Sequence, residues 1–189
     1  MSGHVMDAGR SQVLVIDVQE RLAPAMEDTD QIVGTCAFLA KVAGLLSVPV
    51  LITEQYPKGL GGTLTAITQA ATKPAIVSKT AFSAAREPKV MDRLRKKRGD
   101  QRRDQAIICG IESHVCVLQT ALDLKESGFE VFVVADAITS RRLGSRDVAL
   151  SRMAHAGIIP VTSEMVAFEW MGDASHKAFK AISALVRDR

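Results

Sequence analysis

Three side chains of different chemistry follow three predicted strands of this chain: a carboxylate, an amine and a thiol. Asp17 follows an apolar run at 13–16, Lys79 follows one at 75–78, and Cys116 lies a few residues beyond one at 105–109. A thiol becomes a nucleophile when a nearby cation or a helix N-terminus favours its thiolate and a base takes its proton. The three residues therefore predict a cysteine nucleophile, if the fold brings them together.

The elements that must position these residues alternate between short β-rich apolar runs and segments of helical period. Strands are predicted at 13–16, 50–53, 75–78, 105–109, 130–135 and 159–162, with helices at 31–46, 114–127 and 145–156, one opened by Pro88 and a last one capped by Asp173. This order indicates right-handed β-α-β units. We expect one three-layer α/β/α domain over residues 1–189, with a mostly parallel, six-stranded, Rossmann-like sheet. In such sheets ligands bind at the carboxyl ends of the strands.

Each of the three residues also has an ordinary structural explanation. A lone cysteine is more often a buried small hydrophobe, an aspartate at a strand end a turn former, and a lysine there a solvated side chain. Their conjunction at one sheet edge favours chemistry, because Cys116 also falls at the start of a predicted helix. The unpaired N–H groups and the dipole of that helix favour a thiolate and could hold an oxyanion.

Composition sets the class of protein. The chain has 189 residues, of which 47% are hydrophobic and 24% charged, and this excludes a disordered chain, a collagen-like fibre or a disulfide-stapled miniprotein. The apolar runs are too short to span a membrane, and we expect neither a membrane partner nor a secretory signal. Three cysteines without a CxxC pair fit free thiols. The cytoplasm is the expected compartment, with an organelle as the alternative.

A basic stretch supports a second hypothesis. The stretch from Arg93 to Arg103 reads RLRKKRGDQRR, while the whole chain has a net charge of only +3. Such a run could bind phosphate backbones, and the alternative function is a nucleic-acid-binding or ribonuclease-like protein on the same fold. The run has no aromatic residue to stack bases, however, and a solvated turn at a helix end is the more ordinary explanation.

Three segments resemble the signature segments of the isochorismatase-like cysteine hydrolases. They are VIDVQ at 15–19, SKTAFS at 78–83 and GIESHVCVLQT at 110–120, and they occur in the family's order over nearly the whole chain. The family includes nicotinamidases, N-carbamoyl amide hydrolases and isochorismatases. The segment TEQYPKGLG at 53–61 is most similar to the isochorismatase-domain-containing proteins that lack a metal site.

The resemblance implies a role for each matching residue. Cys116 would be the nucleophile that forms a thioester, and Asp17 the general base that passes the thiol proton to the leaving amine. Lys79 would stabilise the thiolate and orient Asp17. The family's non-proline cis peptide maps to the bond between Ile111 and Glu112, where it would direct the backbone N–H groups of Glu112 and Cys116 at the oxyanion. We therefore expect a hydrolase that cleaves a small amide or a related C–N bond.

Two departures narrow the expected chemistry. Metal-dependent nicotinamidases carry an Asp and several His after the second strand, whereas this loop has Glu54 and no histidine. The histidines at 4, 114, 155 and 176 have no metal-ligand spacing, so we predict no metal and no cofactor. Isochorismatases cleave a vinyl ether without the cysteine, so the presence of Cys116 favours acyl chemistry.

The rest of the site is predicted less sharply. Glu54, Tyr56, Phe82 and His114 are candidates for lining the pocket of a small-molecule substrate. His114 could equally point away from the pocket and satisfy a loop carbonyl. The family resemblance also implies a homo-oligomer.

Overall fold

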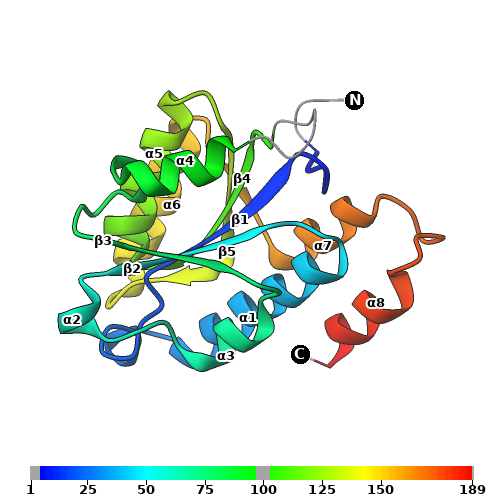
Figure 1. The fold of residues 1–189 in the computed structure, drawn as a ribbon, viewed down its shortest axis with the longest axis horizontal. Coiled ribbons are helices and arrows are strands. Elements are labelled where there is room, and N and C mark those ends of the chain that lie inside the picture. Colours follow the sequence, from blue (N-terminus) through cyan, green and yellow to red (C-terminus); the bar gives the residue numbers. More distant parts are fainter. Residues whose placement is uncertain (1–4, 97–102, 189) are drawn as a thin grey trace.

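The computed structural model describes residues 5–96 and 103–188, which form a six-stranded sheet with helices on both faces (Figure 1). The strands are β1 Ser11–Ile16, β2 Val50–Gln55, β3 Ala75–Lys79, β4 Gln105–Ile111, β5 Glu130–Thr139 and β6 Ile159–Val161. Their order is β3-β2-β1-β4-β5-β6, and all the strand pairings are parallel. The predicted α/β fold with a parallel sheet is therefore confirmed.

The helices divide between the two faces of the sheet (Figure 1). One face is covered by α1 Thr29–Leu45, α3 Thr65–Ala70, α7 Ser163–Met171 and α8 Phe179–Arg187. The other face is covered by α4 Pro88–Arg95, α5 Leu118–Glu126 and α6 Leu143–His155. The short helix α2 Pro57–Leu60 lies in the loop after β2. No helix in the described ranges is long and apolar enough to cross a membrane.

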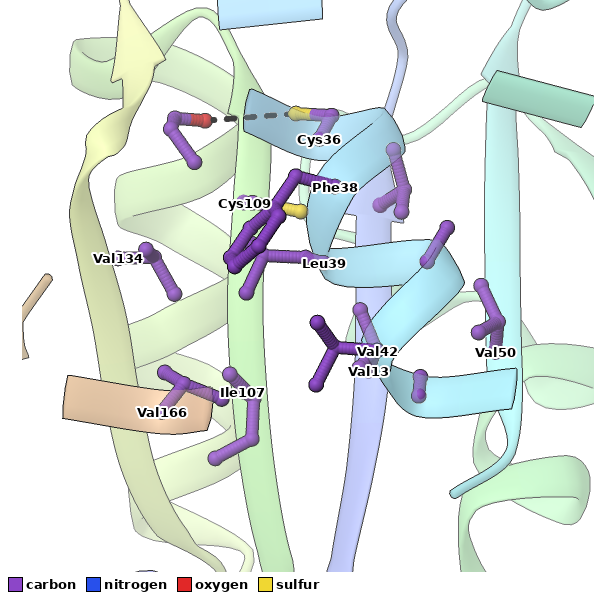
Figure 2. Close-up of a cluster of buried hydrophobic side chains, with 14 of the residues drawn as sticks. Val13, Cys36, Phe38, Leu39, Val42, Val50, Ile107, Cys109, Val134 and Val166 are labelled. Atoms are coloured by element: carbon purple, nitrogen blue, oxygen red, sulfur yellow. Dashed lines mark hydrogen bonds between the residues drawn. The ribbon is translucent and has the colours of Figure 1, made fainter. Parts of the chain in front are cut away.

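Alternate residues of the central strands supply the two cores. In β1, Val13 and Val15 pack beneath α1, while Leu14 and Ile16 face the opposite helices. Every residue of β1 and β4 is buried, and strands covered on both faces read as continuous apolar runs. Figure 2 shows the α1 side, where Cys36 and Cys109 lie among apolar side chains and the Cys36 thiol donates to the Ala137 carbonyl at 3.6 Å.

The strand order reverses next to β1, because β2 and β3 lie on one side of it and β4 to β6 on the other. Gly110 of β4 lies opposite Ile16 at this point, with a φ of +116°. A Cβ on Gly110 would lie 2.1 Å from the Ile16 carbonyl oxygen, so only glycine fits. Ligands of open parallel sheets bind at such a reversal, outside the carboxyl ends of the strands.

The C-terminal prediction was wrong. Asp173 does not cap the last helix, because its Oδ1 accepts a hydrogen bond from the Ser175 backbone N–H at 2.6 Å in a local turn. The last helix, α8, begins only at Phe179, and α7 precedes Asp173. The sequence did not indicate α7, because its apolar side chains lie on both sides of the helix and two of them, Met165 and Phe168, are exposed.

Candidate active site

The carboxyl ends of β1, β3 and β4 bring the three predicted residues to one edge of the sheet. Asp17 directly follows β1, and Lys79 is the last residue of β3 rather than the residue after it. Cys116 lies in a π-helical turn, Ser113–Val117, which leads from β4 into α5. All three residues are almost completely buried.

Asp17 and Lys79 form a buried ion pair. The Lys79 Nζ lies 2.7 Å from Asp17 Oδ2, and neither side chain is exposed to solvent. Asp17 has a φ of +53°, a left-handed conformation that aspartate tolerates better than most residues. Its Oδ1 accepts a second hydrogen bond from the Thr53 hydroxyl at 2.7 Å. Both carboxylate oxygens are thus held in place, which fixes the direction of the carboxylate.

The thiol of Cys116 interacts with both members of this ion pair. The pKa of the Cys116 thiol is raised to about 12, first by burial and then by the negative charge of Asp17 and a hydrogen bond to it, while the positive charge of Lys79 acts to lower it. Lys79 favours the thiolate as expected, but burial and Asp17 outweigh it, so the pKa of the thiol is raised overall. At neutral pH Cys116 is a thiol with a carboxylate beside it that can take its proton.

The loop before Cys116 contains the cis peptide bond, between Ile111 and Glu112. The Glu112 carbonyl accepts hydrogen bonds from the backbone N–H groups of Val115 and Val117, which closes the loop. The Glu112 side chain points to the next loop, where its Oε2 lies 3.1 Å from both the backbone N and the Nε of Arg141. The oxyanion role of the Glu112 and Cys116 N–H groups stays a prediction.

The four candidates for the pocket wall lie in different environments. Tyr56 and Phe82 are each 56% exposed at the edge where β2 and β3 end. Glu54 binds the loop after β2, because its Oε1 accepts from the backbone N–H and the hydroxyl of Thr63. His114 Nδ1 lies 2.9 Å from the Ser140 hydroxyl, so this ring is engaged with the β5–α6 loop. Two candidates are therefore open to a ligand and two already have protein partners.

Sequence reasoning missed three polar residues of the site. Thr53 binds Asp17, as described above. Gln55 Oε1 accepts from the Lys79 ammonium at 2.7 Å, and Gln19 binds the backbone of Gln55. The available signal was position: Thr53 and Gln55 flank the end of a buried strand, and Gln19 lies two residues after Asp17 within VIDVQ. In the described ranges, no group of three His, Cys, Asp or Glu side chains is arranged to hold a metal ion.

The fold and this edge define a class: an open parallel α/β protein with a buried thiol, carboxylate and ammonium at the carboxyl edge of its sheet. The isochorismatase domain model matches residues 11–165, and the chain belongs to that family. Isochorismatase domain-containing protein 2 of Bos taurus is 43% identical over 180 residues, which cover 95% of this chain and 84% of that protein.

Two further relatives agree with this membership. Isochorismatase domain-containing protein 2A of Mus musculus is 40% identical over 178 residues, covering 94% of this chain and 83% of that protein. A solved structure named as MAR1 ribonuclease from Caenorhabditis elegans has a TM-score of 0.90 and 37% identity, and it covers 97% of this chain and 92% of that one. The family and the fold predicted from the sequence are confirmed.

Proposed function

We propose that this protein is a cysteine hydrolase that cleaves a small amide or a related C–N bond through a thioester on Cys116. The observation that carries the proposal is the buried cluster at the sheet edge, where Asp17 and Lys79 form an ion pair and both act on the pKa of the Cys116 thiol. A base, a cation and a nucleophile in mutual contact are the minimum for nucleophilic catalysis by a thiol. Membership of the isochorismatase family supports a hydrolase.

The mechanism follows from the protonation states. With a thiol pKa of about 12, Cys116 is protonated before the reaction, so proton transfer to Asp17 accompanies attack of the sulfur on the carbonyl carbon. The developing oxyanion would be bound by the backbone N–H groups of Glu112 and Cys116. The C–N bond breaks as Asp17 returns the proton to the leaving nitrogen. Water then attacks the thioester, and its proton passes through Asp17 to the sulfur, which restores the thiol.

The experiment is a search for the acyl-enzyme. Purified protein is incubated with a panel of small primary amides and N-carbamoyl compounds, quenched in acid and digested for mass spectrometry, while free ammonia is measured in parallel. We expect an acyl adduct on the Cys116 peptide for at least one substrate that also releases ammonia. Cys116→Ala should release none, and Asp17→Asn should be about 100-fold slower or more. Ammonia release that survives in Cys116→Ala would refute the thioester mechanism.

A ribonuclease-like activity is the second candidate, and two observations favour it. The solved structure from Caenorhabditis elegans carries that name. Arg93, Lys96 and Arg103 line a hollow of about 180 Å³ near the amino ends of β1, β2 and β3. Residues 97–102 of the basic stretch lie outside the described residues.

The two candidates are separated by RNA cleavage in matched variants. Cleavage that survives Cys116→Ala but falls with Arg93→Ala and with rising salt would favour the ribonuclease. The basic stretch supports the ribonuclease less strongly than the buried cluster of Asp17, Lys79 and Cys116 supports the hydrolase. In its described part, Arg103 Nη1 already donates to the carbonyl oxygens of Ala8 and Ser11.

The proposal also covers the number of domains, the oligomeric state and the cellular location of the protein. We propose that residues 1–189 form a single domain, that the protein is a homo-oligomer, and that it works in the cytoplasm. Limited proteolysis, sedimentation analysis and microscopy of the tagged chain test these in turn. A sedimentation mass equal to the 20.3 kDa of one chain would contradict the homo-oligomer.

A further inference from the structure

The Lys79 ammonium is surrounded by more acceptors than it has hydrogens. Its Nζ lies 2.7 Å from Asp17 Oδ2 and 2.7 Å from Gln55 Oε1, and the carbonyl oxygens of Ala81 and Phe82 lie at 3.1 and 3.0 Å. An ammonium offers three hydrogens. One of the four acceptors is charged, and the Gln55 amide oxygen is as close to the nitrogen as that carboxylate oxygen.

The chemistry of its neighbours fixes the orientation of the Gln55 amide. The Gln55 amide nitrogen donates to the Thr80 carbonyl at 2.7 Å, while its oxygen faces the ammonium. The opposite orientation would place the amide N–H groups against Lys79 and the amide oxygen against another oxygen. A glutamate side chain would have the same shape, but it would repel the Thr80 carbonyl and bring a second carboxylate to the lysine.

The backbone of Gln55 is held as firmly as its side chain. The buried Gln19 accepts from the Gln55 backbone N–H at 2.7 Å and donates to the Gln55 carbonyl at 3.0 Å. It also donates to the Gly61 carbonyl at 2.7 Å, which ties the loop after β2 to the same point. In the sheet Gln55 pairs with Lys79 across β2 and β3. Gln19 and Gln55 thus form a rigid support beneath the ammonium.

We propose that Gln55 is a positioning residue of the cysteine site, whose amide oxygen holds the Lys79 ammonium against Asp17 without adding a second negative charge. The proposal rests on the hydrolase function above and goes beyond it. Among the described residues Asp17 is the one carboxylate paired with Lys79, so the lysine keeps enough positive charge to stabilise the sulfur when the thiol loses its proton. A carboxylate at position 55 would neutralise the lysine further and oppose the thiolate.

The test measures the second-order rate of iodoacetamide labelling of Cys116 at pH 8, mapped by mass spectrometry. The variants are Gln55→Glu, which adds a negative charge beside Lys79, and Gln55→Met, which removes the amide oxygen without adding a charge. Gln69→Glu is the matched control, because it makes the same chemical change on the exposed side of α3. Melting curves of all variants identify any that fail to fold. Since the labelling rate follows the thiolate fraction, one unit of thiol pKa changes it tenfold.

We expect Gln55→Glu to label Cys116 about tenfold more slowly than the wild type or slower still, and Gln55→Met about threefold more slowly, because the ammonium loses one of its two closest acceptors. Gln69→Glu should keep the wild-type rate. Wild-type labelling in Gln55→Met would overturn the proposal, because the amide oxygen would then not hold the ammonium. Wild-type labelling in Gln55→Glu, or equal slowing by Met and Glu, would overturn it as well, because the charge would then not matter. Asp17→Asn is measured alongside. If Asp17→Asn also leaves the rate unchanged, the proposed cysteine site itself fails; if Asp17→Asn alters it and Gln55→Glu does not, only the role of Gln55 fails.

Discussion

At the scale of single residues, the central feature is that Cys116 is kept as a thiol. The residue is only 5% exposed, and burial together with the charge of Asp17 raises the pKa of its thiol to about 12 against the opposing charge of Lys79. A buried thiol of this kind does not react indiscriminately. It becomes a nucleophile when Asp17 takes its proton during attack, which links reactivity to the arrival of an electrophile.

This shift of the thiol pKa predicts how stability depends on pH. The folded-state pKa of Cys116 lies above the roughly 8.5 of an unfolded thiol, so the folded state favours the protonated form. The resulting stabilisation is complete below about pH 8.5 and is lost as the pH rises toward 12. Between pH 8.5 and 11 the free energy of unfolding of the wild type should fall more steeply than that of Cys116→Ser, by up to about 1.4 kcal/mol per pH unit.

Urea unfolding of the two proteins at several pH values measures the difference. The pKa of Cys109 is also raised well above its usual value, by a hydrogen bond with Cys36 and by burial. Because Cys109 is present in both proteins, its contribution to the pH dependence cancels in the comparison. Parallel curves for the wild type and Cys116→Ser would show that the thiol is not held in its protonated form.

The residues of the cluster could be predicted from the sequence, but the sign of the Cys116 pKa shift could not. Strand ends are visible as the ends of apolar runs, and a parallel sheet places those ends together, so Asp17 and Lys79 followed from spacing. The pKa of the thiol depends on how deeply the sulfur is buried and how close the carboxylate lies. The spacing of residues in the sequence determines neither quantity.

At the scale of elements, the contact between β1 and β4 positions the site. Gly110 lies against Ile16 at the end of β4, immediately before the loop that carries Glu112 and Cys116. The pairing of β4 with β5 is also irregular here, with a register shift between Ile108 and Gly110. The glycine lets the two backbones approach closely, and this approach sets where the cysteine loop leaves the sheet.

Gly110→Ala should therefore be severely destabilising. The added Cβ would meet backbone atoms of Ile16 at 2.1, 2.6 and 2.8 Å, and its φ of +116° is strained for alanine. We expect a loss of about 3 kcal/mol or more in the free energy of unfolding. Gly34→Ala on α1 is the matched control, because nothing lies within 4 Å of its added Cβ.

The control should be neutral or stabilising by up to about 1 kcal/mol, since alanine suits a helix interior better than glycine. Chemical denaturation of both variants measures the two effects. Similar stabilities for Gly110→Ala and Gly34→Ala would mean that the close approach of β1 and β4 is not needed for folding.

Elements were predictable where the apolar pattern was regular and less so where it was not. The strands on both sides of β1 appeared as short apolar runs between breakers, and Pro88 opens α4 as expected. The end of β5 was placed at residue 135, but the strand continues to Thr139. Its extension includes polar residues such as Asp136, whose carboxylate accepts hydrogen bonds from Ser163, the first residue of α7. Partners so distant in sequence leave no local signal.

At the scale of the whole molecule, the two ends of the sheet carry different chemistry. The carboxyl edge holds the buried cluster of Asp17, Lys79 and Cys116, and the amino edge carries the exposed basic residues Arg93 and Lys96. The family could be predicted from three short segments, and the parallel fold from the alternation of apolar runs with helical segments. The glutamine support of Lys79 could not, because it depends on amide orientations that only the packed loops determine.

The most direct test of the cysteine site is the labelling rate of Cys116 in the wild type, Asp17→Asn and Lys79→Met at one pH. The charge of Asp17 raises the thiol pKa and that of Lys79 lowers it. The labelling rates of the two variants should therefore depart from the wild-type rate in opposite directions. We predict labelling about tenfold faster in Asp17→Asn, which should nevertheless lose turnover, and slower labelling in Lys79→Met. Equal rates in all three folded proteins would contradict the account, because Cys116 would then not be coupled to the ion pair.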